Sequence, residues 1–236
     1  MTLDPRLFAE GPARDARFAV REVWAEMDNL ESDTLLNREF LHRQMNEEVN
    51  GLEIAARNLA DFPDAPWALR MEIARQCWDE SRHVTMFRRC YERRGGRVGE
   101  HPVLNFQYRI ITRIASLVGR LAVQNRSFEA AGIDGIQEGI AVARARGEDD
   151  LVELLEAQLA DEVHHVRYAN DWIRRLAESG GARAAFDVAR AVAHANEAMA
   201  VVAGENTVRY AVAEELRREA GFSAGEIAAV KEAREP

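Results

Sequence analysis

A nine-residue pattern, Gln-x-x-Asp-Glu-x-x-His-Val, occurs twice in this chain. It covers residues 76–84 and, 82 residues later, 158–166. Both copies lie in segments with helical apolar periodicity, and on an α-helix residues i and i+3 lie on the same face. Each copy therefore places one carboxylate beside one imidazole, Glu80 beside His83 and Glu162 beside His165. The repetition requires a fold with two equivalent helices that present the same pair of groups.

Helical periodicity runs nearly from end to end, and proline and glycine separate the segments. Helices are expected at about 13–29, 33–61, 66–94, 149–178 and 183–234, the last interrupted near Gly204. Another begins between 103 and 111, ends at Gly147 and kinks near Gly132 and Gly135. The prediction is an all-α fold in one domain over 1–236. A four-helix core at about 33–178 has a long crossover and is flanked by helices 13–29 and 183–234.

Composition excludes some classes of function. The formal charge of −9 argues against binding a nucleic acid backbone, which needs clustered cations. A local group of arginines is interpreted as a solvated helix C-terminus, where the helix dipole favours cations: Arg88, Arg89, Arg93, Arg94 and Arg97. A cytoplasmic protein without a membrane contact is predicted from three features. The two cysteines show no pairing pattern, the N-terminus has no apolar core of a signal peptide, and no apolar run reaches about 20 residues.

The two motif helices bury carboxylates on otherwise apolar stripes. At about 100° per residue, Glu80 and Glu162 fall on the faces that also collect the large aliphatic residues. Burying a carboxylate is costly unless it is paired or bound to a metal. The helix before Glu162 carries Glu129 on its own apolar stripe, which makes Glu129 the third inward carboxylate.

The fourth carboxylate is chosen among Glu47, Glu48 and Glu53. Glu48 lies in the middle of the apolar stripe of its helix, 15 residues before the turn at Pro63. Glu80 lies 17 residues after that turn, so the two meet at similar depth. Glu53 would be misplaced by roughly 10 Å at about 1.5 Å per residue. It stays as the alternative or additional ligand, because a π-bulge would rotate it inward.

The predicted ligands fit a dinuclear metal site in a four-helix bundle. The set is Glu48, Glu80, His83, Glu129, Glu162 and His165. Carboxylates and imidazoles without thiolate suit two iron ions, with manganese–iron or two manganese ions as alternatives. Asp161 and Asp79 are expected to accept the free N–H of His83 and His165, respectively. Four amides, each four residues before a ligand glutamate, either line the cavity or make local hydrogen bonds: Gln44, Gln76, Asn125 and Gln158.

At roughly residues 35–178 the chain resembles the ferritin-like superfamily of di-iron carboxylate proteins. Four segments are similar to a family of ferritin-like domains of unknown function that is related to tRNA-modifying di-iron hydroxylases: 52–55, 62–66, 128–134 and 161–166. The resemblance implies a ferritin-like bundle and the same order of ligands along the chain. It also implies a carboxylate at the Glu53 position, which keeps Glu53 a candidate. Asn46 departs from the family, whose members usually have histidine there.

The resulting functional prediction is an O₂-activating di-iron oxidase or oxygenase acting on a small organic substrate, with O₂ as co-substrate. An external electron donor and a homodimer are the further partners considered, and nucleic acid and membrane are not expected. The alternative is a ferroxidase or an iron-handling or peroxide-scavenging protein without an organic substrate. A tRNA-modifying hydroxylase is the third interpretation, which the acidic balance of the chain disfavours.

Overall fold

Helices dominate the computed structural model, which describes residues 3–27, 36–204 and 210–234, and they confirm the all-α prediction. The chain divides into two compact units. Unit 1 comprises Met1–Leu117 and Ala193–Thr207, and unit 2 comprises Val118–Val192 and Val208–Pro236. Among the described residues no helix is both long and apolar enough to cross a lipid bilayer. That all 236 residues form one domain stays a prediction.

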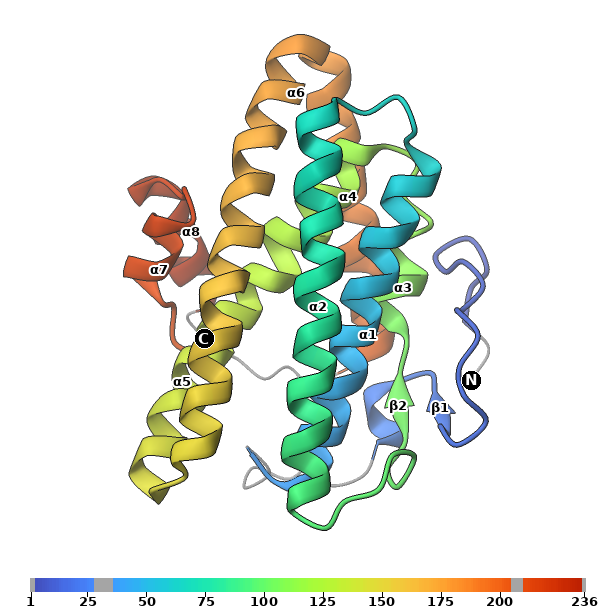
Figure 1. Cartoon of the computed structure of the whole chain (residues 1–236). Coiled ribbons are helices and arrows are strands. Elements are labelled where there is room, and N and C mark those ends of the chain that lie inside the picture. The colour runs from blue at the N-terminus through green and yellow to red at the C-terminus, as the bar shows by residue number, and fades with distance from the viewer. Residues whose placement is uncertain (1–2, 28–35, 205–209, 235–236) are drawn as a thin grey trace. The chain divides into compact units, whose positions relative to one another are not determined.

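Unit 1 is built on the antiparallel hairpin of α1 (Arg38–Asp61) and α2 (Trp67–Arg93), which lie side by side in Figure 1. The side chain of Asn37 caps α1 by accepting a hydrogen bond from the backbone N–H of Phe40 at 2.8 Å. Pro63 and Pro66 end α1 and precede α2, because proline lacks the N–H that a continuing helix needs. Large aliphatic and aromatic side chains fill the unit's core, among them Leu41, Leu69, Ile73 and Phe87.

The predicted helix over 13–29 was wrong for its described part. Residues 13–27 instead contain β1 (Val20–Arg21) and the short 3-10 helix η1 (Trp24–Glu26). β1 pairs in parallel with β2 (Val103–Leu104), and residues 28 and 29 lie outside the described residues. Arg14 explains the difference, because its largely buried side chain binds Glu53 of α1 and ties an extended segment to that helix. This tertiary contact overrides the local helical propensity.

The connection from the first hairpin to the second contains β2 and the short helix α3 (Phe106–Ile111). The next helical stretch consists of three parts: α4 (Leu117–Val123), the π-helical segment η2 (Gln124–Glu129) and α5 (Ala130–Arg146). The irregularity thus precedes Gly132 and Gly135, where the sequence suggested a kink. Gly147 ends α5 in the left-handed conformation, with a φ of 69°.

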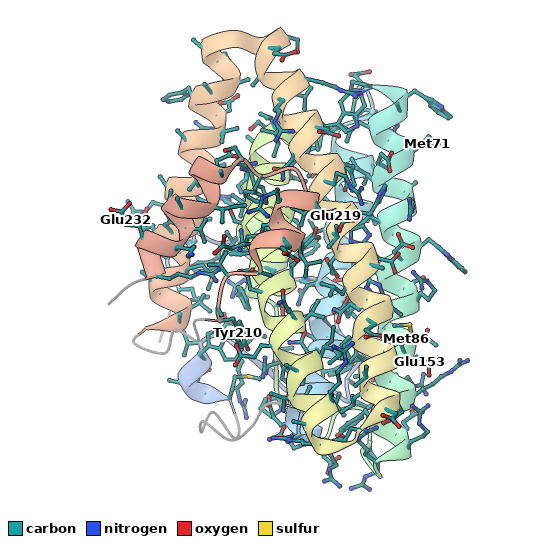
Figure 2. All side chains as sticks on the ribbon, turned by 90° about the vertical axis from the view of Figure 1, so that its left-hand side faces the viewer. Met71, Met86, Glu153, Tyr210, Glu219 and Glu232 are labelled. Carbon is teal, nitrogen blue, oxygen red and sulfur yellow. The ribbon has the colours of Figure 1, made fainter. Side chains whose placement is uncertain are left out.

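In unit 2, α5 is followed by α6 (Asp149–Ala203), whose residues from Ala193 on belong to unit 1. The backbone of α6 breaks at Gly181, close to the predicted stop at Gly180. Two terminal helices, α7 (Glu214–Glu219) and α8 (Ala224–Arg234), pack on α5 and the first part of α6 through a shared core that includes Ile133, Val166 and Phe222. Figure 2 labels Glu219 at the end of α7 and Glu232 in α8.

Candidate metal centre

The first group of predicted ligands lies within unit 1. α1 supplies Glu48, and α2 supplies Glu80 and His83, with exposed fractions of 5%, 2% and 0%. His83 Nδ1 is 3.0 Å from Glu48 Oε2 and 3.5 Å from Glu80 Oε2. One ligand atom from each residue lies within 4.8 Å of the others. We call these three residues half-site 1.

Two residues position Glu80 in half-site 1. Gln76, one turn earlier on α2, donates a hydrogen bond from Nε2 to Glu80 Oε1 at 3.0 Å. Gly51 of α1 leaves the space that the carboxylate occupies, because a Cβ at Gly51 would lie 2.8 Å from Glu80 Oε1. Sequence reasoning missed Gly51. Its signal was a glycine inside a predicted helix, where it costs about 1 kcal/mol relative to alanine and so needs a packing reason.

The second group lies within unit 2. His165 is fully buried, and its Nδ1 is 3.5 Å from Glu162 Oε2 on the same helix, α6. A carboxylate oxygen of Glu129, at the end of η2, lies within 4.8 Å of a ring nitrogen of His165. Glu129 and Glu162 are 9% and 5% exposed. We call Glu129, Glu162 and His165 half-site 2.

The π-helical segment gives Glu129 two amide partners. Asn125 donates from Nδ2 to Glu129 Oε2 at 2.7 Å, and Gln124 donates from Nε2 to Oε1 at 3.0 Å. On a regular α-helix a residue five positions earlier lies on a different face, whereas a π-turn adds one residue and aligns it. Gln124 was therefore missed, because α-helical periodicity gives no signal for it.

The remaining predicted residues occupy varied places. Glu53 forms an ion pair with Arg14 at 2.6 Å, and Asp79 lies between Arg75 at 3.4 Å and Arg82 at 3.2 Å. Asp161 and Gln44 are half-buried, and Gln158 is buried. For Gln76 and Asn125 the sequence left two interpretations open, lining a cavity or making local hydrogen bonds, and both side chains make local hydrogen bonds. In each half-site the histidine Nδ1 faces a carboxylate, which leaves Nε2 for the predicted aspartate contacts. Those contacts stay predictions.

A further buried carboxylate, Glu47, lies on another face of α1. Both its oxygens are buried without a hydrogen-bond partner among the described residues. Burial raises the pKa of Glu47 to about 7, against the opposing influence of Arg43 and Arg14, and nearby Glu39 raises it further. Glu47 thus keeps its proton to a higher pH than an exposed glutamate does.

The donor groups of both half-sites fit an iron or manganese ion. In half-site 1, two carboxylates and an imidazole are almost completely buried and close together. A bound cation would neutralise the two negative charges and so reduce the cost of burying them side by side. Half-site 2 has the same three groups, and neither half contains a thiolate, which a structural zinc site commonly uses. The protein thus carries buried Glu/His clusters suited to metal, and the assignment of each side chain as a ligand stays a prediction.

Two comparisons found known proteins that are similar to this chain. The bacterioferritin of Streptomyces coelicolor is 35% identical to the chain over 78 residues, which are 32% of the chain and 47% of the bacterioferritin. The chain thus spans about half the length of that curated relative. No solved structure matches the chain. Together with the helical fold and the Glu/His clusters, the similarity indicates a ferritin-like protein.

A family model supplies the other comparison. The model described as "Protein of unknown function (DUF455)" matches residues 4–228, which is nearly the whole chain. The match includes every residue of half-sites 1 and 2. The chain belongs to the DUF455 family.

Proposed function

We propose that half-sites 1 and 2 together bind two iron ions, and that the protein uses them to activate O₂ for the oxidation of a small organic substrate. The observation that carries this proposal is the matched chemistry of the two half-sites. Each contains two buried glutamates and one fully buried histidine, and in each the histidine and one of the glutamates come from a copy of the same nine-residue motif. One half-site alone offers too few groups for two ions, whereas two halves supply the ligand number of dinuclear carboxylate bundles.

The side chains would divide the work as follows. His83 and His165 would each bind one ion through Nδ1, the nitrogen that faces a carboxylate in both half-sites. The four glutamates would supply the remaining oxygen ligands and balance the charge of the ions. Gln76 orients Glu80, and Gln124 and Asn125 orient Glu129, through the hydrogen bonds described above. When bound, the iron ions supply the electrons and the open coordination positions that O₂ reduction requires.

The burial of both half-sites supports chemistry that must exclude bulk water. All six side chains are at most 9% exposed. Buried apolar side chains lie on the same helices, Ile73 and Phe87 in α2 and Leu155 and Val166 in α6. Such surroundings strengthen charge–charge interactions and protect reactive species from side reactions.

Metal content per chain tests the proposal. The protein is loaded with Fe(II) without oxygen, desalted and subjected to elemental analysis, in parallel with His83→Ala, His165→Ala and the control His194→Ala. We expect two irons per chain in the native protein and in His194→Ala, and at most one in each of the other two variants. If the native chain retains fewer than two irons, or if both site variants retain two, the proposed dinuclear site is wrong.

Iron handling is the second candidate, and the similarity to a bacterioferritin favours it. A ferroxidase would consume one O₂ for every two Fe(II) that it oxidises and then stop when the added Fe(II) is exhausted. An oxidase or oxygenase with a continuous supply of electrons would consume O₂ through many turnovers at a fixed iron content. Oxygen uptake by the loaded and desalted protein, with and without a chemical reductant, separates the two candidates.

A further inference from the structure

Glu47 of α1 carries a carboxylate that the described residues leave without a hydrogen-bond donor. Both its oxygens are buried and unpartnered, although the residue as a whole is only half-buried. A buried polar group without a partner is costly, and more so when it carries a charge. Outside the described residues the sequence holds one further basic side chain, Arg209. The Glu47 carboxylate is therefore suited to a partner that is not part of the chain.

The described charges around Glu47 are one cation short. Those close enough to act on it are Arg43, Arg14 and Glu39. Arg43 donates from Nε to Glu39 Oε1 at 3.0 Å, and Arg14 Nη1 donates to Glu53 Oε2 at 2.6 Å. Each guanidinium group thus has a carboxylate of its own, and Glu47 is the third carboxylate beside two guanidinium groups. One positive charge is missing from this part of unit 1 as described.

Glu47 lies beside half-site 1. Gly51 is one turn further along α1, and at about 100° per residue the two positions differ by about 40° around the helix. The carboxylate of Glu80 occupies the space beside Gly51, with Oε1 2.8 Å from the position that a Cβ would take. Because Cβ atoms four residues apart on a helix are separated by about 5–6 Å, Cβ of Glu47 lies within roughly 9 Å of Glu80 Oε1. A small molecule bound at Glu47 can therefore extend to half-site 1.

We propose that the carboxylate of Glu47 binds the protonated amino group of a small primary amine, which is the organic substrate of the protein. This inference rests on the proposed function, and it adds the class of the substrate and the side chain that holds it. The ammonium group supplies the missing positive charge, and its N–H groups donate to Oε1 and Oε2 of Glu47. The carbon chain of the amine extends from there toward Glu80.

An organic cation fits Glu47 better than a further metal ion does. Among the residues that the structure describes, Glu47 belongs to neither group of three or more side chains that could hold a metal. Ca²⁺ takes about six to eight oxygen ligands and Mg²⁺ about six, whereas an ammonium group has only three N–H donors, which one carboxylate can largely satisfy. A water molecule would donate to the oxygens without supplying the charge. The experiment must therefore distinguish a cation from water.

Ligand-dependent stability tests the proposal. The probes are the straight-chain primary amines from methylamine to hexylamine, each compared with the uncharged alcohol of the same length. Metal-free protein is unfolded by heat at increasing probe concentration and constant ionic strength, because a ligand that binds only the folded chain stabilises it. Glu47→Gln removes the charge and keeps the shape of the side chain. The control Glu92→Gln makes the same change at an exposed position of α2.

We expect at least one amine to raise the unfolding temperature saturably, with a dissociation constant at least about tenfold lower than that of the matched alcohol. Glu47→Gln should raise this dissociation constant by about tenfold or more, as for the loss of a charged hydrogen-bond partner, and Glu92→Gln should behave as native. In protein loaded with paramagnetic Mn(II) and desalted, the proton NMR signals of the amine should broaden in the native chain and much less in Glu47→Gln. This broadening falls steeply with distance from the ion, so it reports whether the amine lies beside the metals.

Four results would overturn the proposal: no saturable effect of any amine, equal effects of amines and alcohols, equal binding in the native chain and Glu47→Gln, or a bound amine whose signals Mn(II) does not broaden. Arg209→Gln adds a fifth. If this substitution lowers the unfolding temperature of the native chain but not of Glu47→Gln, Arg209 is the partner of Glu47 and no ligand is needed. Too few metal ions in the native chain would instead refute the proposed function, and the measurements on metal-free protein would still report on Glu47.

Discussion

Replacement of Gly51 by alanine isolates the contact between α1 and the carboxylate of Glu80. A Cβ at this position would lie 2.8 Å from Oε1, 2.9 Å from Cδ and 3.1 Å from Oε2 of Glu80. Atoms do not approach a Cβ closer than 3.0 Å, so the carboxylate must move. Its present position is fixed by the 3.0 Å hydrogen bond from Gln76 Nε2. The substitution should therefore displace a predicted metal ligand without removing it.

The control for this substitution is Gly132→Ala. Gly132 lies in α5, and an added Cβ there would meet no atom within 4 Å. Both substitutions gain about 0.5–1 kcal/mol of helix propensity, and only Gly51→Ala adds the overpacking cost of about 1–3 kcal/mol. We therefore expect metal-free Gly51→Ala to be less stable than Gly132→Ala by about 1–3 kcal/mol. Its affinity for iron should fall by about 10- to 100-fold, as when the support of a ligand is lost.

Urea denaturation of the metal-free variants measures the difference in stability, and anaerobic titration with Fe(II) measures the affinity. Gly132→Ala should bind iron like the native protein and unfold at a slightly higher urea concentration. If Gly51→Ala matches Gly132→Ala in both stability and iron affinity, Glu80 does not occupy the space beside Gly51, and the arrangement of half-site 1 around this glycine is incorrect.

Three further predictions concern buried titratable groups that are not part of either half-site, and urea denaturation checks each of them. Glu47→Gln should raise the free energy of unfolding by about 1–3 kcal/mol at pH 8 and change it little at pH 4.5. The reason is that burial raises the pKa of Glu47 from 4.5 to about 7, so the native fold loses stability as the pH rises through that window. If the free energies of unfolding of the native protein and the variant change with pH in parallel, the prediction is wrong. Arg217 forms a buried ion pair with Asp134, and Arg217→Met should lower the free energy of unfolding by about 3 kcal/mol. After this substitution Asp134 keeps Arg234, at 2.8 Å, as a neighbouring cation. A loss below about 1 kcal/mol would show that the pair with Arg217 contributes little. Burial lowers the pKa of His42 from 6.5 to about 4, and the charge of His101 lowers it further in the same direction. The free energy of unfolding should therefore fall as the pH drops from about 6.5 toward 4. His42→Gln should make this pH dependence weaker, and an unchanged pH dependence would assign it to other groups.

The sequence predicted the helices around both half-sites well, because their signals are local. Prolines marked the turn between α1 and α2, and glycines marked the end of α5 and the break in α6. The failures arose where distant segments interact. The stretch before residue 28 has helical composition, but Arg14 and the pairing of β1 with β2 hold it extended.

Glu48 and Glu53, the two candidates for the fourth carboxylate, have different partners in the structure, and which of them binds a metal stays a prediction. Both residues lie on α1, and composition does not distinguish them. Depth measured from the turn at Pro63 favoured Glu48, and in the structure Glu48 Oε2 lies 3.0 Å from His83 Nδ1 while Glu53 binds Arg14. The π-helical segment that was considered for Glu53 occurs instead at Gln124–Glu129. Periodicity predicted neither its place nor the second amide that it brings to Glu129.

The two half-sites share their ligand types, and amide side chains orient a glutamate in each. Glu80 accepts a hydrogen bond from Gln76, and the two oxygens of Glu129 accept hydrogen bonds from Gln124 and Asn125. Each carboxylate oxygen has two lone pairs, so Glu129 can accept these hydrogen bonds and still bind a metal. The π-helical segment thus fixes the orientation of Glu129 before any metal binds. The carboxylate of Glu80 occupies the space beside Gly51, so a single methyl group there should have a larger effect on metal binding than its size suggests.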